Sequence, residues 1–449
     1  MAAHTYFMSD LHLGGDGELQ HCDFMAELVA FLNDLAGRGE DAELILGGDT
    51  FGFWELTTEE GVGKLDLIIA HHQPIFAALK AAGEKIRITL MVGNHDYDLA
   101  CVPGFRERLA EYNLGLDTAI TLKREVAGRI VWIEHGQQSD PFNASPDYGT
   151  PYALPVGYFI TESIVAGASR SSSFGRGNWL KDIRSVATDQ IPDWVLSNYF
   201  YREMGWMIRS VATVFLLLLT ATALALGAEV LRLTGVIDVN VFLDNRLFRS
   251  LGYVGSVFSA IFIVNMLILF FMLVVAVPGA LVLRDILKTL RRFRITSLRA
   301  SSLEGMNSDV YMKRAREVFA ANPEAAVYLF GHTHHAFQAE ENGRLILNMG
   351  TWLKILDRVP VRFGWLPAVY YPTFRLGYFH ISAGDGGIVV RRVEIAKKPV
   401  PELSLLQRFV TLGRRLPVPD PIPAETVIPA GPAGGGTTPP PSGAGAASP

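Results

Sequence analysis

The sequence predicts an α/β domain into which a pair of long apolar helices is inserted. Short apolar runs alternate with helical patterns up to about residue 160, and the same alternation resumes after about residue 300. Several of these runs end in a glycine followed by a polar side chain, and functional sites in α/β sheets are usually built at the ends of strands. Two long uncharged apolar runs separate the two parts.

The composition is more apolar than that of an average soluble protein. The 449-residue chain is 49% hydrophobic and 19% charged, whereas about a quarter of the residues are charged in a typical globular protein. The formal net charge of −5 gives no global basic signature, so no nucleic-acid partner is indicated. The only cysteines, Cys22 and Cys101, have no disulfide-framework or metal-type spacing, which is consistent with a reducing compartment.

The first part of the predicted domain, residues 1–160, is a series of strands and helices. Four short, mostly apolar runs are predicted to be strands: they cover 5–8, 43–46, 86–92 and 129–133. A helix is predicted at 24–35, where apolar residues recur at helical spacing. Another is predicted at 65–79, where Pro74 indicates a break or a kink. Residues 161–206 are expected to form a loop and interfacial segment.

Two uncharged runs are long enough to be membrane-spanning helices, which need about 20 apolar residues. The first run covers Val211–Ala228 and the second covers Leu251–Leu283. We therefore expect a transmembrane hairpin over residues 207–283, with spans at about 209–230 and 254–283. The alternative is that both runs are core helices of a soluble domain.

Residues beside the two runs predict their orientation. Five aromatic residues precede the first run as an interfacial aromatic belt would; they are Trp194, Tyr199, Phe200, Tyr201 and Trp206. Eight Lys or Arg residues flank the outer ends of the hairpin and three lie in the connecting loop, which places the outer ends in the cytoplasm. A two-span hairpin returns the chain to the side it left, so both halves of the α/β domain face one compartment.

The second span is followed by a basic segment. Leu283, Ile286, Leu287 and Leu290 fall at helical spacing, and Lys and Arg residues occupy the other faces. Residues 284–300 are therefore expected to form a basic amphipathic juxtamembrane helix, which either lies on an anionic leaflet or continues the span as a solvated helix. Met1–Asp10 lacks a basic n-region and a long apolar run, so the N-terminal part is expected to stay in the cytoplasm. Together with the hairpin, this predicts a two-span protein of the inner, cytoplasmic membrane whose catalytic domain faces the cytoplasm.

The α/β pattern resumes in residues 301–400. A helix is predicted at 309–320, and strands are predicted at 326–330, 378–381 and 388–395. Asn342-Gly343 predicts a tight hairpin turn. Residues 416–449 are rich in Pro, Gly and Ala, and they are expected to be a disordered tail.

Five short blocks supply the residue types from which metal sites are built. Together they contain three carboxylates, one amide and five imidazoles, each beside a glycine or at a predicted strand end. The blocks are Asp10-Leu11-His12, Gly48-Asp49, Gly93-Asn94-His95-Asp96, His135-Gly136 and Gly331-His332-Thr333-His334. Such oxygen and nitrogen donors suit zinc, manganese and iron ions, and two ions about 3.5–4 Å apart suit attack on phosphorus.

In this order the blocks resemble the motifs of the calcineurin-like metallophosphoesterase superfamily. The resemblance covers roughly residues 4–140 and 305–395. It implies a β-sandwich flanked by helices, here interrupted by the two-helix transmembrane hairpin. It also implies a cofactor of two divalent metal ions, manganese, iron or zinc, and a phosphatase-type hydrolase that uses metal-hydroxide attack on phosphorus.

The resemblance implies a role for each residue of the blocks. Asp10, His12 and His334 would bind the first metal; Asn94, His135 and His332 would bind the second; Asp49 would bridge the two. His95 would contact the phosphate and protonate the leaving oxygen, and Asp96 would orient His95. His335 adjoins the last block and is a candidate substrate contact. The other histidines are expected to be structural or exposed: His4, His21, His71, His72 and His380.

Local similarity suggests a substrate class. The runs Ser9–Gly14 and Gly48–Trp54 look like the branch that contains UDP-2,3-diacylglucosamine hydrolases, which act on a lipid pyrophosphate at the membrane surface. The chain departs from that branch at His95 and His335, where arginine is common, and in its hairpin.

Three interpretations follow for the partners of the chain. A phosphoester or pyrophosphate of a lipid or nucleotide-lipid is the first, with membrane lipids as a further partner. A phosphodiesterase or protein phosphatase acting on a soluble substrate is the second. A non-catalytic membrane scaffold that retains the fold is the third, but a scaffold has no need of His95 and Asp96.

The hairpin makes a direct prediction about topology. A reporter fused after Gly235, in the predicted connecting loop, should face away from the cytoplasm because each span crosses the membrane once. Enzymatic or fluorescent topology reporters measure this directly, and a cytoplasmic signal at this position would refute the hairpin.

Overall fold

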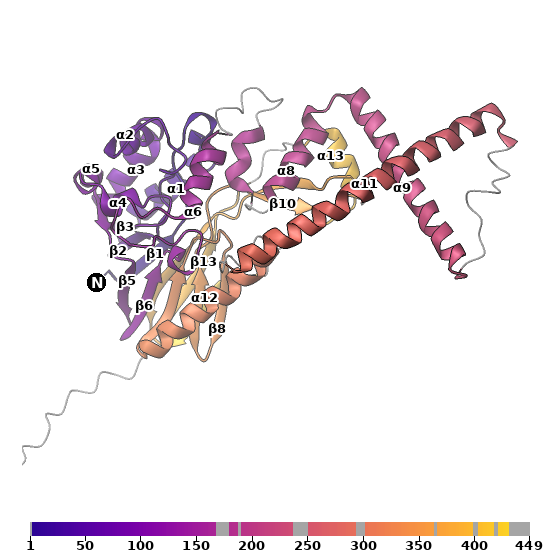
Figure 1. Cartoon of the computed structure of the whole chain (residues 1–449). Helices are drawn as coiled ribbons and strands as arrows, with labels where there is room; N and C mark the ends of the chain where they lie inside the picture. The colour runs from indigo at the N-terminus through magenta and orange to yellow at the C-terminus, as the bar shows by residue number, and fades with distance from the viewer. Residues whose placement is uncertain are drawn as a thin grey trace, which may run out of the picture.

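The computed structural model describes most of the chain and has a mixed α/β architecture (Figure 1). The described residues are 2–167, 179–186, 190–236, 250–292, 301–362, 366–397, 403–416 and 421–430. Their strands form a 7-stranded sheet, a 5-stranded sheet and a 2-stranded sheet. The α/β class predicted from the sequence is therefore confirmed.

The 7-stranded sheet joins the two ends of the chain. Its order is β14-β13-β12-β1-β2-β3-β4, with β1 to β4 parallel and β12 antiparallel to β1. Its strands are β1 (His4–Met8), β2 (Ala42–Leu46), β3 (Arg87–Met91), β4 (Leu114–Asp117), β12 (Gly377–Gly384), β13 (Gly387–Glu394) and β14 (Glu425–Pro429).

The 5-stranded sheet has the order β5-β6-β7-β9-β8. Its strands are β5 (Thr121–Val126), β6 (Arg129–Glu134), β7 (Ala325–Phe330), β8 (Phe337–Glu341) and β9 (Arg344–Asn348). β6 and β7 pair in parallel, although the two apolar runs lie between them in the sequence. The Asn342-Gly343 turn joins β8 to β9, with both residues at positive φ, as predicted for a hairpin.

The two sheets face each other across one hydrophobic core. Alternate residues of a strand point to opposite faces, so Phe7 of β1 and Ile45 of β2 join Ile133 of β6 and Leu329 of β7 in this core. Tyr6, which alternates with Phe7, joins a second core on the other side of the 7-stranded sheet. Because both faces of β1 and β2 are covered, these strands are almost entirely buried, as is typical of parallel strands.

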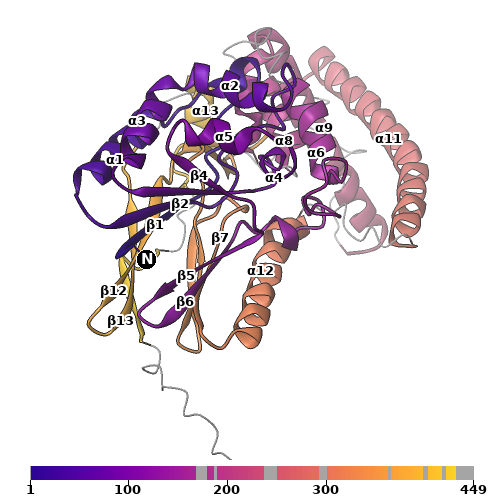
Figure 2. The same ribbon diagram turned by 90° about the vertical axis from the view of Figure 1, so that its left-hand side faces the viewer.

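Helices cover the two outer faces, which gives four layers (Figure 2). The 7-stranded sheet is covered by α1 (Met25–Gly37), α2 (Val62–His71), α3 (Gln73–Gly83) and α5 (Phe105–Ala110). The 5-stranded sheet is covered by α12 (Ser301–Ala321), with Tyr311 and Val318 against Tyr328. Pro74 lies in the first turn of α3, where its missing N–H leaves no helical hydrogen bond unmade, so the predicted break is confirmed.

A second, smaller packing unit connects the sheets to the apolar helices. It contains α6 (Val156–Ile160), α8 (Ile191–Asn198), the 2-stranded sheet of β10 (Ile355–Val359) and β11 (Val369–Thr373), and α13 (Leu405–Val410), together with short 3₁₀ and π turns at 161–166, 179–185 and 199–203. The expectation that 161–206 is a loop was therefore wrong for its described residues; 168–178 and 187–189 lie outside them.

The aromatic residues of this unit explain why a loop was wrongly expected at 161–206. They also show that only part of the predicted interfacial aromatic belt is exposed. Trp194, Phe200 and Tyr201 are buried against other parts of the protein, including β11. Tyr199 and Trp206 are exposed. The sequence showed a cluster of aromatic residues before a long apolar run, but it did not show that three of them form a protein core.

Two long apolar helices, α9 (Trp206–Leu233) and α11 (Tyr253–Arg292), extend away from the sheets (Figure 1). Both are long and apolar enough to cross a membrane, with mean hydropathies of 2.2 and 3.0 over windows that are only 12% and 6% buried. They are therefore not core helices of the α/β domain. α11 runs without interruption past Pro278 into the basic segment up to Arg292, and residues 293–300 lie outside the described residues.

The predicted disordered tail contains a strand. β14 pairs antiparallel with β13, and Ile428 is buried in the core between the sheets. The overall composition of 416–449 hid the run Thr426-Val427-Ile428, whose β-branched side chains favour a strand. The expectation was wrong at 421–430, while 417–420 and 431–449 lie outside the described residues.

The strand β14 can be tested by a pair of substitutions. Ile428→Ala should lower the free energy of unfolding by about 2–5 kcal/mol, because it removes a buried side chain from the core. The control Val427→Ala lies on the exposed face of the same strand and should change stability by at most about 0.5 kcal/mol. Unfolding of the detergent-solubilised protein measures both, and equal effects would contradict the assignment.

Candidate metal centre

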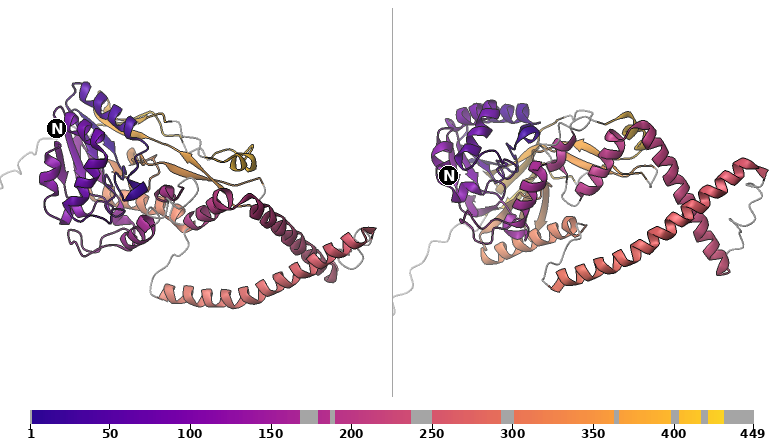
Figure 3. Two further views of the ribbon diagram at one scale, coloured as in Figure 1. Left: turned by 90° about the horizontal axis from the view of Figure 1, so that it is seen from above. Right: turned by 45° about the horizontal axis from the view of Figure 1, so that its top comes forward.

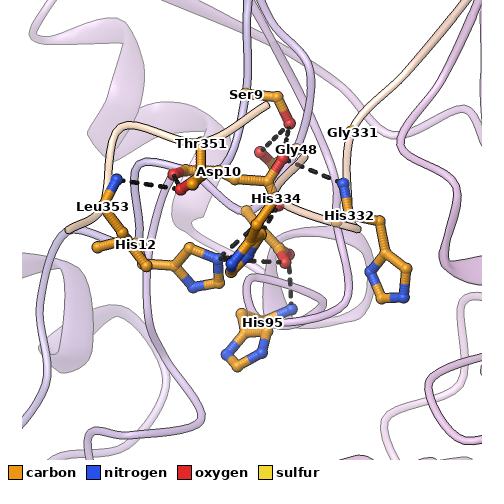
Figure 4. A network of polar contacts seen from close by, with 12 residues as sticks. Ser9, Asp10, His12, Gly48, His95, Gly331, His332, His334, Thr351 and Leu353 are labelled. Carbon is orange, nitrogen blue, oxygen red and sulfur yellow. Dashed lines mark hydrogen bonds and ion pairs between the residues drawn. The ribbon is translucent and has the colours of Figure 1, made fainter. Parts of the chain in front are cut away.

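The five blocks meet because they follow five strands whose carboxyl ends lie together. β1, β2 and β3 are parallel neighbours in one sheet, and β6 and β7 are parallel neighbours in the other. Backbone hydrogen bonds connect the turns that follow them: Asp10 donates to Gly48 at 3.2 Å, and Gly331 donates to His135 at 2.8 Å. The two sheets thereby place side chains from both halves of the sequence in one site (Figure 4).

The first donor cluster combines Asp10 and His12 after β1 with His334 after β7. The Nε2 atoms of His12 and His334 are 3.1 Å apart. The Oδ1 atom of Asp10 lies 3.3 Å from His334 Nε2 and 3.8 Å from His12 Nε2. These atoms face one another as Figure 4 shows, which is the arrangement expected for ligands of a single ion.

The second donor cluster combines Asp49, His135 and His332. The Nε2 atom of His135 lies 3.2 Å from Asp49 Oδ2 and 3.3 Å from Asn94 Oδ1. The Nδ1 atom of His135 is 2.9 Å from the carbonyl oxygen of Gly47. Because a carbonyl can only accept, Nδ1 must donate there, and Nε2 is left as the nitrogen that faces the cluster.

Asp49 of the second cluster also faces the first cluster. Its Oδ2 atom is 3.7 Å from His12 Nε2 in the first cluster and 3.2 Å from His135 Nε2 in the second. Its Oδ1 atom accepts a hydrogen bond of 2.8 Å from the backbone N–H of His95. The carboxylate is thus fixed with one oxygen toward both sets of imidazoles, a position suited to bridging two ions.

The backbone is strained where these donors are presented. Positive φ angles are uncommon for residues other than glycine and cluster at functional sites. Eight described residues other than glycine have positive φ, and five of them belong to the blocks: Asp10, His12, Asp49, His332 and His334. The packing of the surrounding strands therefore holds the donors in conformations that the local chain does not favour.

Two glycines of the blocks are required by close approach. A Cβ at Gly93 would overlap the carboxylate of Asp49, and a Cβ at Gly331 would overlap Ser9 and come within 2.5 Å of Asp10 Oδ2. In each block the glycine therefore makes room for a carboxylate that comes from another strand.

The charges of the site fit a bound cation. Asp10 Oδ1 is buried and has no hydrogen-bond partner within the described residues. Burial alone would lower the pKa of His135, but the charge of Asp49 outweighs it and raises that pKa to about 10. The carboxylates thus attract positive charge strongly, and a divalent metal ion can supply that charge in place of protons on imidazoles.

His95 is paired with a residue that the sequence did not single out. Its Nδ1 atom lies 3.0 Å from Oε1 of the buried Glu55, and its ring lies tilted by 33° against that of Trp54, with centroids 4.4 Å apart. Burial opposes the charged form of His95, but the charges of Glu55 and Asp49 outweigh burial and raise its pKa to about 9. Glu55 therefore favours a protonated imidazole.

The carboxylate of Asp96 bonds to backbone N–H groups and not to the ring of His95 among the described residues, so its orienting role stays a prediction of the resemblance. Its carboxylate accepts backbone hydrogen bonds from Gly93 at 2.6 Å, Thr50 at 2.8 Å and Phe51 at 3.3 Å. These bonds connect the turn after β3 to the turn after β2. Burial, with the nearby charge of Asp49, raises the pKa of Asp96 to about 7. Asp96 thus holds the two turns together beneath the site.

Asp140 is a second residue that the sequence analysis missed. Its Oδ2 atom lies 3.0 Å from His332 Nε2, which orients the ring and leaves Nδ1 as the nitrogen for a cation. Glu55 and Asp140 each follow a block by four to six positions. Proximity to the blocks was the only signal, because carboxylates are common in loops.

The remaining histidines largely follow the sequence expectations. His21 and His71 are exposed, and His72 is buried away from the blocks. The Nδ1 atom of His4 is 3.0 Å from His380 Nε2, in the 7-stranded sheet. His335, the candidate substrate contact, is exposed beside His334, and its role stays a prediction.

Comparisons with known proteins add little to this geometry. No family model matches the chain, and no curated protein matches it. Among solved structures, the chain is similar to a conserved uncharacterized protein of Streptococcus pneumoniae that is described as a predicted phosphoesterase. That match has 10% sequence identity, covers 88% of this chain and 90% of the other, and has a TM-score of 0.27.

The position of Asp49 predicts a difference in metal content between two variants. Asp49→Asn should lose most bound metal, because it removes the charge nearest both clusters. His95→Ala should keep its metal, because His95 belongs neither to the cluster of Asp10, His12 and His334 nor to the cluster of Asp49, His135 and His332. Elemental analysis of the purified variants measures this, and equal metal loss in the two would show that the assignment of His95 is wrong.

Proposed function

We propose that this chain is a membrane-anchored phosphoesterase with two divalent metal ions, related to the calcineurin-like metallophosphoesterases. The observation that carries the proposal is the position of Asp49, whose Oδ2 atom faces imidazoles of both donor clusters. Two ions that share a carboxylate and lie about 3.5–4 Å apart are suited to in-line displacement at phosphorus.

The residues of the site divide into two groups of ligands. Asp10, His12 and His334 would hold one ion, and Asn94, His135 and His332 would hold the other, with Asp49 between them. Manganese, iron and zinc all accept such oxygen and nitrogen donors. When bound, the ions would lower the pKa of water and neutralise charge on the phosphoryl oxygens.

In this proposal His95 would act as the general acid. In hydrolysis, the oxygen of water forms a bond to phosphorus and the bond from phosphorus to the leaving oxygen breaks. The leaving oxygen requires a proton, which the imidazolium of His95 can donate. Glu55 favours that imidazolium, and the ring of Trp54 packs against it. Glu55 therefore takes the orienting role that the resemblance gave to Asp96.

Membrane anchoring is supported by α9 and α11, which are long, apolar and largely uncovered by protein. We propose that they form a two-span hairpin in the inner, cytoplasmic membrane and that the metal centre faces the cytoplasm. A lipid or nucleotide-lipid phosphoester or pyrophosphate is the substrate class that best fits an enzyme held at a bilayer. A soluble phosphodiester or phosphoprotein is the alternative, in which the hairpin only localises the enzyme.

The proposal predicts a loss of turnover without a loss of metal in two variants. His95→Ala should lower kcat by about 10²–10⁴-fold on an aryl phosphodiester, because the general acid is removed. Glu55→Gln should lower kcat in the same direction while both variants retain metal. Metal-supplemented assays of the full chain in detergent measure the rates.

The control is Glu60→Gln, which makes the same carboxylate-to-amide change at an exposed position and should leave the rate unchanged. Equal turnover in the wild type and His95→Ala would argue against the enzymatic role of this site. A panel of lipid pyrophosphates, phosphodiesters and phosphomonoesters then separates the substrate classes.

A further inference from the structure

The short helix α13 presents an apolar face that the protein leaves uncovered. Leu405, Phe409 and Leu412 are 84%, 64% and 66% exposed. Leu405 and Phe409 are separated by four positions, which places them on the same side of α13, and Leu412 lies in the turn that follows the helix. Scattered single apolar residues are normal on a protein surface, but a group of large ones marks an interaction site.

The opposite side of α13 fixes this face in place. Val410 is buried and Leu406 is partly buried in a cluster with Phe200, Tyr201 and Val369. Ser404 caps the helix in a reciprocal capping box with Gln407. The exposed leucines and Phe409 are therefore not the frayed end of a chain, because the helix is anchored by its other side.

The apolar face lies where the first long helix begins. Phe200 and Tyr201, which share a cluster with α13, lie in the turn Tyr199–Glu203, shortly before α9 begins at Trp206. Arg209, in the first turn of α9, donates to the carbonyl oxygens of Tyr201 and Met204 at 3.1 and 2.6 Å. Figure 3 shows α13 beside the start of α9 in both views. A bilayer crossed by α9 would therefore have its surface close to α13.

The charged residues within 403–416 are of one sign. The stretch 403–416 contains three arginines and no acidic residue, and Arg408, Arg414 and Arg415 are all exposed. Large apolar side chains bordered by arginine fit the boundary between the acyl chains and the headgroups of an anionic leaflet. Trp206 is exposed at the adjoining end of α9, where an aromatic side chain suits the same boundary.

We propose that residues 403–416, which contain α13, form a second membrane contact that docks on the surface of an anionic bilayer. Leu405, Phe409 and Leu412 enter the acyl boundary, and the arginines bind lipid phosphates. This inference rests on the proposed anchoring by α9 and α11. The second contact would fix the orientation of the metal centre relative to the bilayer, because a surface contact beside the start of α9 opposes rotation of the domain about that helix.

The test places a fluorescent probe on the apolar face of the full chain. Leu412→Cys is labelled with the environment-sensitive dye NBD in a background that carries Cys22→Ala and Cys101→Ala, and the protein is reconstituted into vesicles of phosphatidylglycerol and phosphatidylcholine. Val427→Cys is the matched control, because it is an exposed apolar position on β14. The emission of the probe at 412 should shift to the blue in these vesicles, and lipids with brominated acyl chains should quench it. Neither effect should occur for the probe at 427.

A second arm tests the arginines. In the triple variant Arg408→Glu, Arg414→Glu and Arg415→Glu, quenching at 412 should fall to the level seen at 427. For the protein that keeps its arginines, quenching at 412 should be weaker in vesicles of phosphatidylcholine alone than in anionic vesicles. Quenching at 412 no greater than at 427 in anionic vesicles overturns the inference. A blue shift without quenching by brominated lipid also overturns it, because the face is then covered by a second copy or another protein.

Carbonate extraction separates this inference from the proposed anchoring. If the chain stays in the membrane pellet but the probe at 412 is not quenched, only the second contact fails. If carbonate releases the chain, the anchoring by α9 and α11 fails, and with it the premise on which the second contact rests. Unchanged circular dichroism of the labelled variants confirms that each is folded.

Discussion

The attraction between buried carboxylates and imidazoles at the meeting of two sheets is the interaction on which the rest of this structure depends. Asp10 and Asp49 come from adjacent parallel strands and would repel each other in a buried site. Imidazoles from the second sheet surround them, and their positive charge or that of bound metal offsets the repulsion. The β-sandwich is therefore more than a scaffold, because neither sheet alone supplies both the carboxylates and the full set of imidazoles.

That constraint explains where backbone strain and close approaches occur. Asp10, Asp49 and His332 all have positive φ, and such conformations persist only where the surrounding structure imposes them. Gly93 and Gly331 allow carboxylates from other strands to come within van der Waals distance of the backbone. The insertion of two long helices between β6 and β7 does not disturb this arrangement, since the chain returns to a strand that is parallel to the one it left.

The sequence predicted what is local and periodic, and it failed where distant parts of the chain decide the outcome. The strands that carry the blocks follow from short apolar runs, and the break before α3 follows from Pro74. The pairing of His95 with Glu55 instead of Asp96 depends on how two turns pack. The burial of Trp194 and the pairing of β14 with β13 also depend on distant partners, so composition and periodicity could not reveal them.

The account requires two ions on either side of Asp49, and the anomalous diffraction of a manganese- or zinc-loaded crystal tests this most directly. The account predicts two anomalous peaks, one among Asp10, His12 and His334 and one among Asn94, His135 and His332, with Asp49 between them. A single peak, or peaks away from Asp49, would contradict the assignment of a shared two-metal centre.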